Sequence, residues 1–321
     1  MVSFGVIGAG IIVEPHLKAI AARDDICLKA VCDLDEQKAR KAAEPFGAKV
    51  YRDYIEMLDK EAPDAVIINL PHYLHEPCVA ACAARGIHIL CEKPMSVSAA
   101  SCRRMTQACR DARVVLQIGH IQHYDPATRA AEALIRQGAI GDLLLIDDMR
   151  YDNYFLPERP RWFLNKKLSG GGIMINLGAH AIDKIRFLTG SEVADVTGHV
   201  TYARPEFDVE GSAQVYLKME NGITASVTLC GYAVDGYYNV TTLLGSRGMM
   251  KLRCGSDLQI SRDGGELEPI DLSAYPEAFS AQLDDFMKAL AGGPVMCPGE
   301  YGTAILDTIE KVYGTGKEQE G

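Results

Sequence analysis

The sequence predicts an α/β protein of two parts. We expect an N-terminal Rossmann domain, a doubly wound parallel sheet, over residues 1–121, and a C-terminal α+β domain with an open, mainly antiparallel sheet over residues 122–321. In the first part, short apolar runs alternate with helical patterns of about ten residues, and right-handed crossovers join such strands into a parallel sheet. In the second part, strand-like runs follow one another through Gly and Asn turns without intervening helices, which is typical of antiparallel sheets.

The elements of the first part alternate in type along the chain. Apolar runs predict strands at residues 2–7, 27–33, 65–70, 87–92 and 114–120. Amphipathic periodicity predicts helices at residues 13–22, 35–46, 75–86 and 98–112.

The second part opens with a helix over residues 125–138, which leads into a strand at 142–151. Further strands are expected at residues 213–220, 223–231, 238–245 and 249–254. Two amphipathic patterns near the end predict helices that pack back on the body, at residues 279–293 and 300–314.

Composition narrows the class of protein and its partners. Of the 321 residues, 48% are hydrophobic, and no stretch reaches the roughly 18 apolar residues that a membrane span needs. The start, "MVSFGVIGAG", lacks a basic n-region, so we expect no signal peptide and a cytoplasmic location. The net charge of −10 argues against nucleic acid and anionic membrane as partners, because both require a basic face.

The ten cysteines are scattered through apolar segments of a long chain, so reduced core thiols are favoured over disulfides. Cys78 and Cys82 lie four residues apart on an expected helix, but no second pair at zinc-binding spacing accompanies them. We therefore expect no metal site.

A glycine-rich turn follows the first expected strand. Gly8 permits a tight turn and Gly10 lets the backbone approach a pyrophosphate, while Ile11 and Ile12 lead into a helix whose N-terminus offers free N–H groups. Val13 stands where the dinucleotide fingerprint has its third Gly or Ala. This order of strand, turn and helix predicts an anion site for a dinucleotide.

Asp33 ends the next strand, 23 residues after Gly10. A carboxylate there would accept hydrogen bonds from the adenine ribose diol and repel a 2′-phosphate, which favours NAD over NADP. Asp33 could also serve as a strand-end or capping residue, although Asp35 is the better candidate to cap the following helix.

Two further strand ends face the same crevice, because ligands of open parallel sheets bind outside the carboxyl ends of the strands. The segment "INLPHYLHEP" places Leu70, Pro71, His72 and His75 after one strand, as candidate cofactor contacts. His75 could equally cap the helix that follows it.

The segment "CEKP" ends the next strand with Glu92, Lys93 and Pro94. Pro94 disfavours helical geometry at Lys93 and stops the ladder, which holds the ammonium at the crevice. Lys93 could be only a solvated turn lysine, but its place favours a functional role. Glu92 is expected to hold the turn or to lie near the cofactor.

The stretch "LSGGGIMINLGAHAIDKIRFLTG" is the most informative of the second part. Asn176, His180 and Asp183 are spaced at i, i+4 and i+7, so a helix would place them on one face beside apolar residues. One histidine on such a helix is usually a satisfied core residue. The amide and carboxylate one turn to either side instead suggest an oriented acid/base.

Five motifs occur in a fixed order along the chain: "GVIGAG…H", "LPHYLH", "CEKP", "GHIQHYDPA" and "GGGIMINLGAHAID". In this order they resemble the Gfo/Idh/MocA family of oxidoreductases. The resemblance spans nearly the whole chain and implies a Rossmann domain, an α/β domain with an open antiparallel sheet that is often used for oligomer contacts, a nicotinamide cofactor, and a sugar, cyclitol or related polyol as substrate. We therefore expect a homo-oligomer, a dimer or tetramer formed through the C-terminal sheet.

The resemblance implies roles for individual residues. Lys93 corresponds to the catalytic lysine of the family and His180 to its acid/base histidine. Asn176 stands where many members have Asp, so a substrate-positioning amide replaces a carboxylate. His123 sits where Arg is commoner, and Asp183 is expected to orient His180.

The implied reaction is reversible oxidation of a secondary ring hydroxyl, in which His180 takes the proton and Lys93 stabilises the alkoxide while a hydride moves to the nicotinamide. Two rivals remain: an NAD-using enzyme that cleaves glycosides by transient oxidation and elimination, and a non-catalytic cofactor-binding regulator. Further substrate contacts are expected from four side chains, of which Trp162 and Tyr151 are equally credible as core: Tyr124, Tyr151, Trp162 and Asn165.

Overall fold

The computed structural model describes residues 1–232 and 237–315, and the chain in it divides into two compact units. Unit 1 comprises Met1–His120 and Phe279–Ala304, and unit 2 comprises Ile121–Ala278 and the described residues from Ile305 onward. The first break lies next to the expected boundary at residue 121. The segment Phe279–Ala304 returns to unit 1, whereas we expected it in the C-terminal domain.

Unit 1 is built on a six-stranded sheet in the order β3-β2-β1-β4-β5-β6, and every pair in it is parallel. The chain begins in the middle of this sheet, so the strand order reverses between β1 and β4, where ligands of doubly wound sheets bind. The strands are β1 (Val2–Ile7), β2 (Ile26–Cys32), β3 (Lys49–Tyr51), β4 (Ala65–Ile68), β5 (His88–Glu92) and β6 (Leu116–Gly119).

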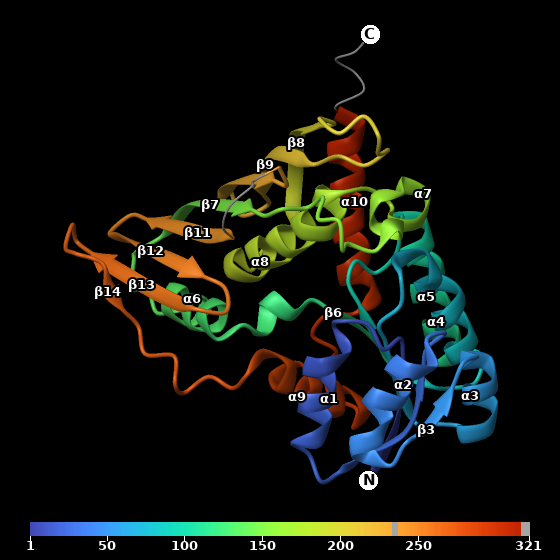
Figure 1. Cartoon of the computed structure of the whole chain (residues 1–321). Coiled ribbons are helices and arrows are strands. Elements are labelled where there is room, and N and C mark those ends of the chain that lie inside the picture. The colour runs from blue at the N-terminus through green and yellow to red at the C-terminus, as the bar shows by residue number, and fades with distance from the viewer. Residues whose placement is uncertain (233–236, 316–321) are drawn as a thin grey trace. The chain divides into compact units, whose positions relative to one another are not determined.

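Helices cover the sheet of unit 1 (Figure 1). One apolar core joins β1 and β2 to α1 (Val13–Ala21), α2 (Glu36–Ala43) and α9 (Ala278–Leu290). The remaining helices of this unit pack in sequence, with α3 against α4 and α4 against α5. They are α3 (Tyr54–Glu61), α4 (His75–Ala83) and α5 (Ala99–Ala112).

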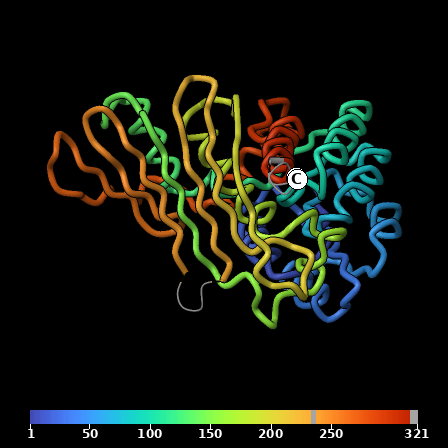
Figure 2. The backbone as a smooth tube through the Cα atoms, turned by 90° about the horizontal axis from the view of Figure 1, so that it is seen from above, coloured from blue at the N-terminus to red at the C-terminus, as the bar shows by residue number. Residues whose placement is uncertain are grey.

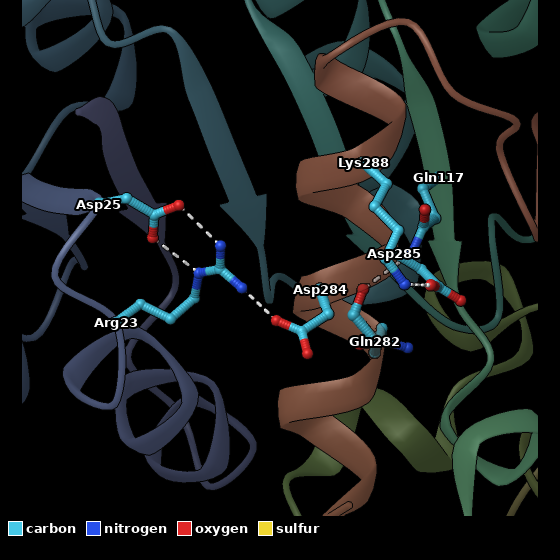
Figure 3. A network of polar contacts seen from close by, with 7 residues as sticks. All are labelled: Arg23, Asp25, Gln117, Gln282, Asp284, Asp285 and Lys288. Carbon is cyan, nitrogen blue, oxygen red and sulfur yellow. Dashed lines mark hydrogen bonds and ion pairs between the residues drawn. The ribbon is translucent and has the colours of Figure 1, made fainter.

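The helix α9 joins unit 1 although it follows the second sheet in the sequence. Its buried Phe286 packs edge-on against Phe4 of β1, with ring centroids 6.1 Å apart. Arg23 bridges Asp25 and Asp284 of α9, as Figure 3 shows. Partly exposed ion pairs of this kind contribute little, about 0–1 kcal/mol, so apolar burial holds α9 in place.

Unit 2 contains an eight-stranded sheet in the order β14-β13-β12-β11-β7-β10-β9-β8 (Figure 2). Neighbouring strands are antiparallel except for the central pair of β7 and β10, which is parallel. The strands are β7 (Leu143–Tyr151), β8 (Val193–Thr201), β9 (Ser212–Met219), β10 (Thr224–Cys230), β11 (Tyr238–Gly245), β12 (Gly248–Arg253), β13 (Asp257–Arg262) and β14 (Glu268–Pro269). The predicted fold class is confirmed.

The helices α6 (Pro126–Arg136) and α8 (Ala179–Thr189) pack together and contact strands of this sheet. Along β9, buried and exposed residues alternate, as expected for a sheet with one covered face. The shorter helices of unit 2 are η3 (Ile121–Tyr124), η4 (Arg161–Leu164), α7 (Lys166–Ser169) and a π-helical turn, η5 (Met174–Gly178). The last helix, α10 (Gly299–Thr315), begins in unit 1 and ends in unit 2.

All ten cysteines are free thiols and seven of them are buried, in agreement with reduced core residues. Among the described residues, no helix combines the length and the apolar character that crossing a membrane requires. Several elements that we did not predict are present, and most are short or at sheet edges: β3, α3, β8, β13 and β14.

Candidate functional site

The glycine-rich turn between β1 and α1 has the backbone that a pyrophosphate site requires. Gly8 has φ +96°, and a Cβ there would lie 2.5 Å from the carbonyl oxygen of Asn69, so only glycine fits. A Cβ at Gly10 would meet no atom within 4 Å, and Ile11 is 95% exposed. The N-cap, Ile12, provides no side-chain cap to α1. An open backbone beside the N-terminus of a helix fits the phosphates of a dinucleotide.

Asp33 follows β2 and points its carboxylate at this turn. Oδ2 accepts a hydrogen bond from the N–H of Ala9 at 2.7 Å, and Oδ1 accepts one from the N–H of Asp35 at 2.8 Å. Asp35 is the N-cap of α2, as predicted. Asp33 therefore links the glycine turn to the second strand, and its remaining lone pairs can still accept ribose hydroxyls.

Contacts of the buried His75 hold the loop after β4 in place. Pro71 precedes a short 3₁₀ turn that begins at the buried His72. His75 is fully buried: its Nε2 lies 2.8 Å from the carbonyl oxygen of Leu70, and its Nδ1 lies 3.2 Å from that of Pro94. Burial lowers the pKa of His75, although the surrounding carbonyl groups favour the charged ring. His75 thus ties the loop after β4 to the loop that carries Lys93.

Glu92 and Lys93 stand at the carboxyl end of β5. Glu92 is buried, and its Oε1 accepts a hydrogen bond from Nε2 of His16 at 2.9 Å, while Oε2 accepts one from the N–H of Lys93 at 3.1 Å. Burial raises the pKa of Glu92, but the hydrogen bond from His16 and the nearby charges outweigh it, so the net shift is downward. Lys93 is partly buried and precedes a cis peptide bond to Pro94.

His16 lies on α1, so the bond to Glu92 connects the helix behind the glycine turn to the strand that carries Lys93. We did not predict this contact from the sequence. The first motif, "GVIGAG…H", ends in this histidine, but the residues around it do not indicate which side chain it contacts.

In unit 2, the π-helical turn η5 continues directly into α8. Asn176 in the turn and His180 and Asp183 in the helix are 7%, 8% and 0% exposed. The Oδ1 atom of Asp183 lies 3.5 Å from Nδ1 of His123. π-helical turns interrupt the regular ladder and are frequent at functional sites.

A buried carboxylate that we did not predict supports this turn. Glu210 accepts hydrogen bonds from the N–H of Gly172 at 2.8 and 2.9 Å, from the N–H of Met174 at 2.9 Å, and from the hydroxyl of Tyr313 at 2.8 Å. A Cβ at Gly172 would lie 2.0 Å from the carbonyl oxygen of Glu210, which explains a glycine at this position. Burial raises the pKa of Glu210, and the hydrogen bonds oppose that effect only in part.

A second buried charge fixes α8 to the sheet. Lys184 forms an ion pair with Asp148 of β7 at 2.6 Å, and Thr241 donates to the same carboxylate oxygen at 2.7 Å. Burial lowers the pKa of Lys184, but the charge of Asp148 outweighs it and the net shift is upward. Lys184 is one turn beyond His180, so this pair sets the rotation of the helix.

The four other candidate substrate residues differ in burial and in the contacts that they make. Tyr124 is buried against the ring of His123, and Trp162 stacks on its neighbour Phe163. Tyr151 lies an odd number of residues from Asp148 on β7, so its side chain points to the other face of the sheet, away from α8. Asn165 is exposed and caps α7 through the N–H of Lys167.

Comparison with known proteins identifies the family. Residues 2–120 match the model described as "Oxidoreductase family, NAD-binding Rossmann fold" of GFO_IDH_MocA, and residues 128–251 match the GFO/IDH/MocA C-terminal domain. The chain belongs to the Gfo/Idh/MocA family of oxidoreductases. The resemblance inferred from the five motifs is confirmed, and with it a first unit of the NAD-binding Rossmann type.

Relatives of this Gfo/Idh/MocA protein are themselves oxidoreductases. It is 28% identical over 303 residues to "Inositol 2-dehydrogenase 2" of Saccharopolyspora erythraea, covering 91% of this chain and 86% of that one. It is 30% identical over 275 residues to an uncharacterized oxidoreductase of Streptococcus pneumoniae, covering 83% and 72%. A crystal structure of an aldose-aldose oxidoreductase from Caulobacter crescentus, complexed with glycerol, has a TM-score of 0.89 and 26% identity, covering 99% and 98%. The protein is an oxidoreductase.

Proposed function

We propose that this Gfo/Idh/MocA protein is a dehydrogenase that transfers a hydride between NAD and a secondary hydroxyl of a sugar, cyclitol or glycoside. The observation that carries the proposal is that both Lys93 and His180 are present and that buried carboxylates hold the segments before them. Lys93 follows β5, and its N–H donates to Glu92, which also accepts a hydrogen bond from His16. His180 follows the turn whose Met174 N–H donates to Glu210. The names of the relatives, an inositol dehydrogenase and an aldose oxidoreductase, support this substrate class.

In this proposal each unit has its own role. The glycine turn and Asp33 of unit 1 bind the cofactor, and unit 2 supplies the residues that select the substrate. We favour NAD over NADP because the carboxylate of Asp33 already lies at the glycine turn, where its charge would repel a 2′-phosphate.

The bound nicotinamide supplies a hydride acceptor at the substrate carbon. His180 takes the hydroxyl proton as a general base, and Lys93 donates a hydrogen bond to the same oxygen and stabilises its developing charge. Asn176 positions a neighbouring hydroxyl. Asp183 acts on the orientation of α8 and, through its contact with His123, on the polar surroundings of His180.

We also propose a homo-oligomer formed through the uncovered face of the sheet in unit 2. Large side chains on this face are exposed, among them Leu145 at 37%, its pair on β11, Leu244, at 38%, and Tyr216 of β9 at 52%. Exposed apolar surface of this kind is typical of protein contacts. Light scattering after size exclusion should give a mass of two or four chains, and a Leu145→Lys variant should shift it toward one.

The test of the proposed reaction is a screen of sugars, inositols and glycosides with NAD or NADP, followed at 340 nm. We expect NADH to accumulate with at least one compound, and Lys93→Met and His180→Gln to lower kcat by 10²–10⁴-fold. Calorimetric binding of NAD to His180→Gln should stay near the wild-type value.

The exposed Lys60→Met is the matched control for charge loss, and it should leave kcat unchanged. Product release without net NADH would support transient oxidation with glycoside cleavage instead. Full activity of both Lys93→Met and His180→Gln would refute the mechanism.

A further inference from the structure

Arg150 lies on the face of the unit 2 sheet that α8 covers. Successive residues of a strand alternate between faces, so Arg150 shares its face with Asp148, two residues earlier on β7. Asp148 forms its ion pair with Lys184 of α8. The side chain of Arg150 therefore projects toward the side of the helix that carries His180.

The strand neighbours of Arg150 bring it near the η5 turn. It pairs with Leu229 on β10 and with Asn239 on β11. Leu229 is buried, and a Cβ at Gly178 would lie 3.3 Å from its Cδ1 atom. Gly178 immediately precedes α8, so this contact places Arg150 level with the first turn of α8, and His180 lies in that turn on the same side of the helix as Lys184.

The guanidinium also borders solvent. Its Cζ atom lies 5.4 Å from the ring centroid of Tyr237, which is 60% exposed and accepts a hydrogen bond from Nδ2 of Asn239 at 3.0 Å. A cation–π contact attracts the charge but leaves the N–H groups without acceptors.

Within the described residues, Nε and Nη1 of Arg150 are buried and have no hydrogen-bond partner. The carboxylate nearest along the strand, Asp148, is already engaged by Lys184 and Thr241. A guanidinium stays charged in proteins, and a buried charge without acceptors is costly. Each of these two unused donors can pair with an oxygen of a carboxylate or phosphate, the groups that the donor fork of an arginine binds most readily.

A second guanidinium flanks the same turn. Nε of Arg159 is also buried without a hydrogen-bond partner in the part of the chain that is described, and its Cζ lies 4.2 Å above the ring of the buried Tyr154. Burial raises the pKa of Tyr154, and a contact with the side chain of Asn176 opposes this. Arg159, a second cation with an unused donor, is therefore separated from Asn176 only by the ring of Tyr154, in a protein of net charge −10.

We propose that Arg150 binds an oxyanion of the substrate, so that the enzyme acts on an acidic sugar or polyol, one that carries a carboxylate or a phosphate, in preference to its neutral counterpart. The proposal rests on the proposed dehydrogenase function and names its substrate class. Arg159 adds positive potential on the Tyr154 side of Asn176.

The experiment compares matched compounds at constant ionic strength: D-glucose, D-glucuronate and D-glucose 6-phosphate, and the same three derivatives of galactose. We expect kcat/KM of the wild type with NAD to be at least about 10-fold higher for one acidic member than for its neutral partner. Comparison of the uronates with the sugar phosphates shows whether a carboxylate or a phosphate is bound. In Arg150→Gln, the ratio of acidic to neutral kcat/KM should fall about 10- to 100-fold.

Arg150→Lys keeps the charge but loses the fork, so its ratio should lie between those of wild type and Arg150→Gln. The exposed Arg262→Gln on β13 is the matched control, and it should keep the wild-type ratio. Near-UV circular dichroism checks that each variant is folded.

Preference of the wild type for neutral members would overturn the inference, as would an equal loss for acidic and neutral compounds in Arg150→Gln. If no compound is turned over, the proposed function has failed on this panel, and calorimetry of glucuronate and glucose 6-phosphate binding to the NADH complex tests the inference separately. Binding that is tighter than that of glucose and weakened by Arg150→Gln supports it, and equal binding refutes it.

Discussion

Replacement of Glu210 by alanine tests whether a buried carboxylate holds the turn that precedes His180. Glu210 accepts hydrogen bonds from the N–H groups of Gly172 and Met174 and from the hydroxyl of Tyr313. Alanine offers no acceptor, so these donors would be buried without partners.

The magnitude follows from the number of donors. Each buried donor left unsatisfied costs about 1–3 kcal/mol, so the two backbone N–H groups alone predict a loss of about 2–6 kcal/mol in the free energy of unfolding. The hydroxyl of Tyr313 can rotate toward another acceptor and adds less. Glu210→Gln keeps the Oε1 acceptor that all three donors reach, but it turns Oε2 into an amide donor beside the N–H of Gly172, so we expect a loss of about 1–3 kcal/mol at neutral pH, smaller than that of Glu210→Ala.

The pH dependence of this pair of variants has a defined sign. Burial raises the pKa of Glu210, so the folded protein binds its proton more readily than the unfolded chain does. The corresponding stability is fully present below the unfolded pKa of about 4.3 and is lost as the pH rises through the folded value. Glutamine does not titrate, so Glu210→Gln should gain stability relative to the wild type as the pH rises from about 4.5 to 7.5.

Urea unfolding followed by far-UV circular dichroism measures these differences, and kcat with NAD measures the effect on the turn. Glu210→Ala should lose both stability and kcat, whereas the calorimetric affinity for NAD, which depends on unit 1, should hold. A loss of stability below about 1 kcal/mol in Glu210→Ala would refute the reasoning, because it would show that water or another group replaces the carboxylate.

Three further changes test other parts of the structure. Asp33→Ala should raise the ratio of kcat/KM with NADP to that with NAD by roughly tenfold or more, because it removes the charge that repels a 2′-phosphate. Gly8→Ala should lower the unfolding free energy by more than about 1 kcal/mol and weaken NAD binding in calorimetry, because its Cβ would collide with Asn69; an unchanged Kd would contradict this. Lys184→Met should cost about 3–5 kcal/mol in urea unfolding, and most of that should return in the double variant with Asp148→Leu, so additive losses would count against a buried pair.

The parallel sheet of unit 1 could be predicted because each strand and helix carries its own pattern. The strand 2–7 was predicted to the residue, and the predicted helix 13–22 extends one residue beyond α1. The strands β3, of three residues, and β14, of two, were missed because short segments contain too few residues to show a period.

The placement of α9 could not be read from the sequence. Its amphipathic pattern predicts a helix with one apolar face, but many apolar surfaces could receive that face. The structure places Phe286 and Leu283 in the core of unit 1. Periodicity predicts that one face of a helix is buried. The surface that this face packs against is determined by the packing of segments that are distant in the sequence.

The candidate site divides in the same way. The places of Gly8, Asp33 and Lys93 directly after β1, β2 and β5 could be predicted from the sequence, because strand order alone brings the carboxyl ends of parallel strands to one edge. The equal treatment of Tyr151 and Trp162 as substrate contacts shows the limit, because the strand parity that turns Tyr151 away from α8 depends on which face the helix covers.

What the sequence determined by itself is therefore the local chemistry: the glycine turn, the strand ends, the order of the five motifs, and hence the family and its NAD-binding fold. The tertiary structure decided which groups support or complete that chemistry. Glu210 and His16 sit in unremarkable segments, and their partners Met174 and Glu92 lie 36 and 76 residues away along the chain. Nε and Nη1 of Arg150 have no partner in the part of the chain that is described. A buried polar group acquires its meaning from the partner that satisfies it, and that partner is a property of the folded chain.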